Sequence, residues 1–134
     1  MINPAELRIG NKISLMHDAS APIFTIQEIR SSGVMGYRHS DRGDEYHEFE
    51  WLLPIALTPD ILIKCGFEKD YDGNLRKQFN PVMELFFNEG NYKQMDLRQY
   101  GSFISFKHAH IKYLHHLQNL FYCLSGEELT VSNL

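Results

Sequence analysis

The chain has 134 residues, of which 43% are hydrophobic and 13% aromatic, and its formal net charge is −4. This composition excludes an intrinsically disordered chain, because disordered segments lack the apolar surface that offsets chain entropy. No apolar run approaches the roughly 18 residues of a membrane span. The start, "MINPAELRIG", has neither the basic cluster nor the apolar region of a secretory signal. We therefore expect a soluble, cytoplasmic globular protein.

The first element predicted along the chain is a single helical turn. Asn3 is suited to cap it, Pro4 to occupy its first position and Glu6 its first turn, while Gly10-Asn11 provides the chemistry of a turn soon after. Four segments of alternating character then predict short strands at roughly ten-residue spacing. They are residues 12–16, 23–29, 34–39 and 46–53.

The fourth of these segments alternates along its whole length. The alternation places His47, Phe49 and Trp51 on one face and Tyr46, Glu48 and Glu50 on the other. Short, evenly spaced strands of this kind are typical of a small, strongly curved sheet. The sequence therefore predicts an SH3-like β unit over residues 1–57.

An α+β unit is predicted for residues 58–134. Thr58-Pro59-Asp60 has the pattern of a helix start, and Gly66 is placed to end that helix. Asp72-Gly73-Asn74 predicts a hairpin between two short strands. Later strands are expected over 82–87, 92–97 and 102–107, and a helix over 111–124 covers the antiparallel sheet. The two halves are either separate units or parts of one compact domain.

Four histidines occur between residues 108 and 116, which raises the question of a metal site. On a helix, His115 and His116 point about 100° apart, and neither has a partner three or four residues on, so the helix carries no chelating pair. A site made by His108, His110 and His115 can be drawn, but the spacing does not demand it. We therefore predict no metal and no cofactor, and solvated or capping histidines beside the packing face.

A second candidate metal site surrounds the loop "DRGDE". His39 and His47 flank this loop, which offers Asp41, Asp44 and Glu45 as oxygen ligands. A calcium loop needs acidic residues at alternating positions and a distant bidentate Glu, and this order is absent. A solvated loop is the prediction here.

No catalytic residue is predicted. The two cysteines, Cys65 and Cys123, have apolar neighbours and are interpreted as reduced, buried core residues rather than as nucleophiles. The sequence contains no nucleophile elbow, phosphate-binding loop, dinucleotide fingerprint or zinc-protease motif. The protein is therefore more consistent with a binding role than with an enzyme.

Two surfaces are predicted for binding. The first is a narrow second stripe on the last helix, which either contacts the first half of the same chain or binds a partner protein or a second copy. It consists of Ile111, His115, Gln118 and Tyr122. The second is a nucleic-acid surface, although Lys and Arg are outnumbered by acidic residues in both halves. It consists of Arg76, Lys77, Tyr92, Lys93, Arg98 and Tyr100.

Three stretches of the chain carry a family resemblance. "LRIGN", "LTPDILIKCGF" and "IKYLHHLQNLFYCLSGEEL", in this order, resemble a group of small uncharacterised proteins from Bacteroidetes-type bacteria and their phages or mobile elements. The resemblance implies a cytoplasmic accessory protein and a structural role for the helix that ends in "SGEEL". It implies no catalytic or binding residue.

The sequence as a whole favours a phage- or mobile-element-type accessory protein that acts as a non-catalytic protein-interaction module. Its partner is another protein or a second copy of the chain, and no membrane is involved. The first alternative is a nucleic-acid-binding module. The second alternative is a small metal-dependent enzyme that uses the histidines.

Overall fold

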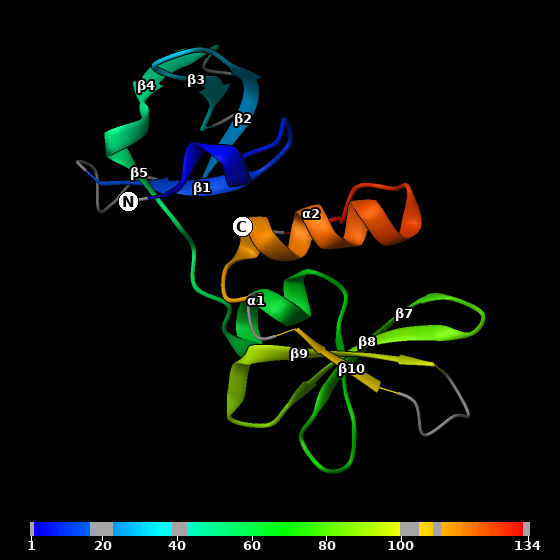
Figure 1. Ribbon diagram of the computed structural model, residues 1–134. Coiled ribbons are helices and arrows are strands. Elements are labelled where there is room, and N and C mark those ends of the chain that lie inside the picture. The colour runs from blue at the N-terminus through cyan, green and yellow to red at the C-terminus, as the bar shows by residue number, and fades with distance from the viewer. Residues whose placement is uncertain (1, 17–22, 39–42, 100–104, 109–110, 133–134) are drawn as a thin grey trace.

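The first half of the chain forms a curled antiparallel sheet in the computed structural model, which describes residues 2–16, 23–38, 43–99, 105–108 and 111–132 (Figure 1). The sheet order is β4-β3-β2-β1-β5. Its strands are β1 (Lys12–Leu15), β2 (Phe24–Ile29), β3 (Gly33–Tyr37), β4 (Glu45–Glu48) and β5 (Leu52–Leu53). β1 pairs with both β2 and β5, and the sheet curls into a half-barrel, as predicted for the SH3-like unit (Figure 1).

A 3-10 turn, η1 (Pro4–Glu6), precedes this sheet. The Asn3 side chain caps it by accepting a hydrogen bond from the backbone N–H of Ala5 at 3.0 Å, as the sequence predicts. The core of the half-barrel is formed by Ile2, which precedes η1, and by inward-facing side chains of the strands. It consists of Ile2, Ile13, Leu15, Phe24, Ile26, Val34 and Leu52.

The segment 46–53 is not the single strand that its alternation predicts. β4 ends at Glu48, and a second 3-10 turn, η2 (Phe49–Trp51), separates it from β5. A 3-10 turn has three residues per turn, so it breaks the two-residue period of the strand. The prediction of two strict faces is therefore wrong, and Tyr46 and Trp51, which it put on opposite faces, line one hollow.

The short helix α1 (Pro59–Lys64) begins the second half. Thr58 Oγ1 accepts a hydrogen bond from the backbone N–H of Ile61 at 3.3 Å, and Pro59 occupies the first turn. Gly66 follows the helix with a φ of 90°, a left-handed conformation that favours glycine. The cap, the proline and the terminating glycine of this helix are confirmed as predicted.

The second sheet is antiparallel, with the order β10-β9-β8-β7-β6. Its strands are β6 (Glu68–Lys69), β7 (Leu75–Asn80), β8 (Met83–Asn88), β9 (Asn91–Gln99) and β10 (Ser105–His108). The predicted hairpin at Asp72-Gly73 joins β6 to β7. Asp70 organises this turn, because its Oδ1 accepts hydrogen bonds from the backbone N–H groups of Asp72 and Asn74, both at 2.9 Å.

The last helix, α2 (Leu114–Ser125), begins three residues later than predicted. The preceding residues are extended and pair with the segment after β5, through a bridge between Ala56 and Tyr113. The backbone N–H of Leu114 completes this pairing by donating to the carbonyl of Ile55 at 2.8 Å. Ile111 is therefore outside the helix, and the prediction that placed it on a helical stripe is wrong.

Helix α2 lies between the curled sheet and the second sheet (Figure 1). Leu114, Leu117 and Phe121 are buried on the second sheet, as predicted for the covering helix. The core there consists of Leu57, Leu62, Cys65, Phe67, Leu75, Leu85, Phe87, Met95, Ile111, Leu114, Leu117, Phe121 and Leu129. The architecture is therefore α+β. Among the described residues, no helix is both long and apolar enough to cross a membrane.

Candidate functional site at the seam of the two halves

The face of α2 that points away from the second sheet is polar, and it contacts the first half of the chain. Gln118 is 1% exposed, and its side chain is paired at both ends. Its Oε1 accepts a hydrogen bond from the backbone N–H of Lys12 at 2.8 Å, and its Nε2 donates to the carbonyl of Gly10 at 3.1 Å. A buried amide with both ends satisfied fixes the position of the helix against β1. We call this polar contact between α2 and the first half the seam.

Asn119 extends the seam by one residue along α2. Its Oδ1 accepts hydrogen bonds from Asn11 Nδ2 at 2.8 Å and from Arg8 Nε at 3.2 Å, and its Nδ2 donates to the carbonyl of Glu6 at 2.7 Å. Arg8 also donates two hydrogen bonds to the carboxylate of Glu128. The stretch "LRIGN" and the C-terminal helix therefore contact each other directly.

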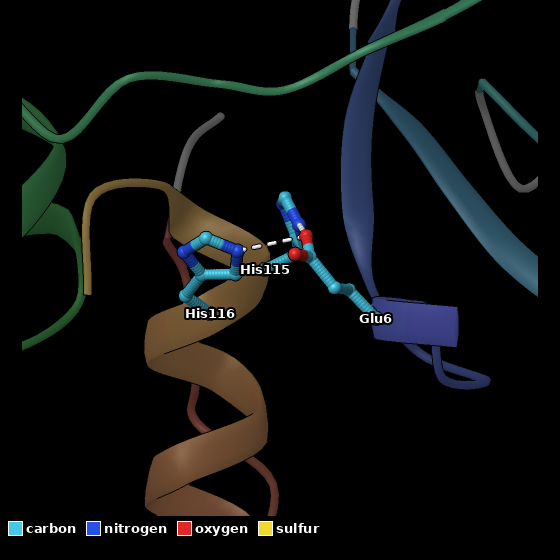
Figure 2. A group of neighbouring side chains, drawn as sticks. All are labelled: Glu6, His115 and His116. Carbon is cyan, nitrogen blue, oxygen red and sulfur yellow. Dashed lines mark hydrogen bonds and ion pairs between the residues drawn. The ribbon is translucent and has the colours of Figure 1, made fainter. Parts of the chain in front are cut away.

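Glu6, His115 and His116 form a compact cluster at the start of α2. Glu6 Oε2 lies 3.2 Å from His115 Nε2 and 2.9 Å from His116 Nε2. Figure 2 shows both imidazoles on the first turn of the helix and Glu6 facing them from η1. The Tyr113 ring stacks on His115, with ring centroids 5.9 Å apart.

The prediction of a solvated or capping histidine is wrong for His115, and the prediction that the two imidazoles diverge is wrong for both. His116 is partly exposed and accepts a hydrogen bond from the backbone N–H of Lys112 just before the helix, as the prediction allows. His115 is fully buried, and both Nε2 atoms reach the same carboxylate oxygen. An angle of about 100° between successive Cα–Cβ directions describes where the side chains start, not where long side chains end. At the first turn, both rings bend toward an acceptor supplied by a residue more than 100 positions away in the sequence.

The electrostatics of the cluster favour a neutral His115 beside an ionised Glu6 carboxylate. The hydrogen bond from His116 holds the pKa of Glu6 below its usual value. Burial lowers the pKa of His115, and its Nδ1 is buried without a hydrogen-bond partner among the described residues. The backbone N–H of Lys112 donates to His116 Nδ1 at 3.4 Å, so that the ring presents Nε2–H to Glu6.

A cavity of about 350 Å³ opens beside this cluster. Its lining combines apolar side chains with Glu6, His116 and the exposed thiol of Cys123. Its remaining walls are Ala5, Ile111, Asn119 and Leu120. The prediction that Cys123 is a buried core residue is therefore wrong. Cys65 is buried as predicted, and burial raises the pKa of its thiol to about 11, which suppresses the reactive thiolate.

The residues predicted as an interaction stripe are used mostly within the chain. Ile111 belongs to the second core, and His115 and Gln118 are buried in the seam. Tyr122 is exposed, and the Arg8 guanidinium lies 4.4 Å from its ring centroid. The sequence left two alternatives open for this stripe. Contact with the first half of the same chain describes His115, Gln118 and Tyr122, whereas Ile111 packs in the second half.

The residues predicted as a nucleic-acid surface do not share one face. Arg76 lies on the sheet face opposite α2 and pairs with Asp70 at 2.8 Å. Lys77 faces α2, with its ammonium 5.6 Å from the Phe121 ring centroid. Tyr92 packs against the second core. The Lys93 side chain and Tyr100 lie outside the described residues.

On the outer face of the second sheet, the arginines pair with carboxylates of the same face. Arg98 pairs with Asp96 at 3.3 Å, and its guanidinium lies 3.5 Å from the Phe86 ring centroid. Arg76 flanks the same ring at 5.3 Å and also approaches Glu84 at 3.8 Å. These arginines therefore cover a buried aromatic ring and neighbouring carboxylates, rather than offering a basic patch for phosphates.

The second metal candidate of the sequence is only partly described. His47 Nε2 lies 3.0 Å from Glu45 Oε1, and Arg38 also pairs with Glu45, at 2.7 Å. His39 and Asp41 of this candidate lie outside the described residues. The same holds for His110 and for the side chain of His108, which belong to the first metal candidate. The described part of this region forms a His–Glu–Arg network and contains no cluster of three metal-ligating groups.

The SH3-like unit carries a surface that the sequence analysis missed, which we call the aromatic–acidic patch. It consists of Tyr46, Glu48, Glu50 and Trp51. Tyr46 and Trp51 are 39% and 40% exposed and, with His47 and Glu48, line a hollow of about 370 Å³. A hydrogen bond to the neighbouring Glu48 carboxylate, together with the repulsion between the two charges, raises the pKa of Glu50. The predicted alternation already places Tyr46, Glu48 and Glu50 on one face. The 3-10 turn adds Trp51, which the alternation put on the opposite face, so the aromatic pair of the patch could not be predicted.

Comparison of the chain with protein-family models, with curated proteins and with solved structures finds no match.

Proposed function

We propose that the protein is a non-catalytic interaction module that binds a basic, apolar-containing segment of a partner protein at the aromatic–acidic patch. The observation that carries the proposal is a hollow lined by the exposed rings of Tyr46 and Trp51 and by Glu48, whose carboxylate lies within hydrogen-bond reach of Glu50. Aromatic side chains are enriched in protein interfaces because they bury a large area and lose little conformational entropy.

The negative charges of the aromatic–acidic patch favour a partner with basic side chains. Glu48 and Glu50 are close enough to hydrogen-bond, and the raised pKa of Glu50 reflects the cost of ionising both. A Lys or Arg side chain placed between them relieves this repulsion and also reaches the faces of Tyr46 and Trp51. The first half as a whole has five Lys and Arg residues against eight Asp and Glu residues, so its field also attracts a basic partner.

Trp51 provides a direct reporter of binding, because it is the only tryptophan of the chain. The probe is a short peptide of alternating arginine and proline, titrated into the full-length protein while the Trp51 fluorescence is recorded. We expect saturable binding in the micromolar to millimolar range that weakens with added salt. A peptide with glutamate in place of arginine is expected to leave the fluorescence unchanged.

Two variants locate the binding surface. The double variant Glu48→Gln/Glu50→Gln is expected to weaken binding of the arginine peptide at least fivefold without altering the far-UV circular dichroism spectrum. Tyr71→Ala removes a still more exposed aromatic ring from the second half, and binding is expected to remain as in the wild type. Equal responses to the arginine and glutamate peptides, or no response of Trp51 to either, would contradict the proposal.

Nucleic-acid binding stays a prediction. Arg76 pairs with Asp70 and Arg98 pairs with Asp96, so the positive charges of these two arginines are already compensated within the chain. Retention on a DNA or RNA column tests it separately. Retention that falls steeply with salt would favour this alternative over the peptide-binding role.

A further inference from the structure

We propose that Glu6, His115 and His116 bind one divalent transition-metal ion of the zinc class. Their ligand atoms, two imidazole nitrogens and a carboxylate oxygen, all lie within 4.8 Å of one another. Nitrogen and oxygen ligands at the usual zinc distance of about 2.1 Å are separated from each other by about 3.4 Å in tetrahedral geometry. The distances of 3.2 and 2.9 Å between Glu6 and the two imidazoles therefore need only small adjustments.

The ligand types select the kind of ion. Imidazole nitrogen suits zinc and its first-row neighbours, whereas calcium and magnesium take sets of oxygen ligands. Glu6 is ionised above acidic pH, and it offsets one of the two charges of the ion. The site lies in the first turn of α2, whose positive end opposes a cation, but this effect is less than about tenfold in affinity.

The cluster has both a rigid and an accessible side. The His115 side chain is 1% exposed, whereas those of His116 and Glu6 are 16% and 42% exposed. An ion can therefore enter from solvent and meet a ligand that is already fixed by packing. Three protein ligands leave a further coordination position, and the 350 Å³ cavity lined by Glu6 and His116 lies beside it for water or a small ligand.

The surroundings of the imidazoles limit the affinity. Coordination through Nε2 requires the ring proton on Nδ1, where a ligating histidine normally donates to an acceptor. His115 Nδ1 has no partner among the described residues, and His116 Nδ1 instead accepts a hydrogen bond from Lys112. Loss of such supporting contacts typically weakens a metal site by about 10- to 100-fold. We therefore expect a dissociation constant in the micromolar range.

The test uses the full-length protein, stripped of metal with a chelator, dialysed and titrated with zinc chloride in a calorimeter. We expect one zinc per chain and a rise of several degrees in the melting temperature at 100 µM zinc, because Glu6 and the two histidines come from opposite sides of the seam. Magnesium at the same concentration is expected to leave the melting temperature unchanged.

Matched variants separate this site from the other histidines of the chain. His116→Gln and Glu6→Gln change partly exposed residues, and each is expected to weaken zinc binding at least tenfold. His47→Gln removes the histidine of another His–Glu pair, His47–Glu45, and zinc binding is expected to stay at wild-type strength. Absence of stoichiometric zinc binding, or binding that survives both His116→Gln and Glu6→Gln, would overturn the proposal.

Discussion

The two cores of the protein and the seam between them are built from different kinds of contact. Each core consists of buried aliphatic and aromatic side chains from its own sheet and the elements that cover it. The seam is held by amides, imidazoles and charged groups of α2 that pair with the first half. Apolar side chains can repack in more than one arrangement. A buried hydrogen bond, in contrast, needs a specific donor and acceptor held within bonding distance of each other. The cores therefore supply most of the stability, and the seam fixes how the halves are placed.

The largest effect is expected from a change within a core. Leu117 is fully buried between α2 and the second sheet. Leu117→Ala is expected to lower the free energy of unfolding by about 2–5 kcal/mol, because it removes apolar contacts and leaves a cavity. Urea denaturation measures this loss. Ile63→Ala, at a position 52% exposed on α1, is the control, and a loss there as large as that of Leu117→Ala would contradict this assignment of the core.

A seam substitution that keeps side-chain volume isolates the hydrogen bonds. Gln118→Met removes the partners of the Lys12 N–H and the Gly10 carbonyl while filling similar space. We expect a loss of about 1–3 kcal/mol, since buried polar groups are left unpaired. Gln78→Met, at an exposed position of β7, is expected to have little effect. If the two variants were equally stable, the seam would not depend on this amide.

The partly exposed Arg8–Glu128 ion pair at the edge of the seam is expected to contribute least to the free energy of unfolding, and its contribution depends on pH. The hydrogen bond from Arg8 lowers the pKa of Glu128 below its usual value of 4.5. Because the folded state holds this carboxylate ionised, the stabilisation is present above the unfolded pKa and is lost as the pH falls through the lowered one.

Glu128→Gln tests this ion pair. The variant is expected to be about 0.5 kcal/mol less stable than the wild type at pH 7, a small value because the pair is partly exposed to solvent. The difference is expected to shrink toward zero as the pH is lowered below about 4. Denaturation curves at several pH values check this, and a difference that grows on acidification would contradict the ion pair.

Local signals in the sequence predict the elements better than they predict the seam. The cap at Thr58, the helix end at Gly66 and the turn at Gly73 are each encoded by a few neighbouring residues, and all three are found in the structure. The 3-10 turn at 49–51 escaped prediction, because a regular alternation of residues conceals a change of backbone period. The local pattern of residues 111–113 likewise did not reveal that they pair with the segment 55–57.

The candidate sites were less predictable because their partners are distant in sequence. The pattern around His115 and His116 contains no chelating pair, and the ligand that joins them is Glu6, 109 and 110 residues away. The packing face of α2 could be identified from its period, but the partners of its polar face could not. A second polar stripe on a helix indicates a second contact without indicating which part of the chain provides it.

The central claim is that the seam joins the two cores into one cooperative unit, and urea unfolding followed by two signals tests it most directly. Trp51 fluorescence reports the first half, and far-UV circular dichroism reports α2. In the wild type the two transitions are expected to coincide. In Gln118→Met/Asn119→Ala the Trp51 transition is expected to move to lower urea, since the first core is the smaller. Separate wild-type transitions, or unchanged coincident transitions in the variant, would contradict the claim.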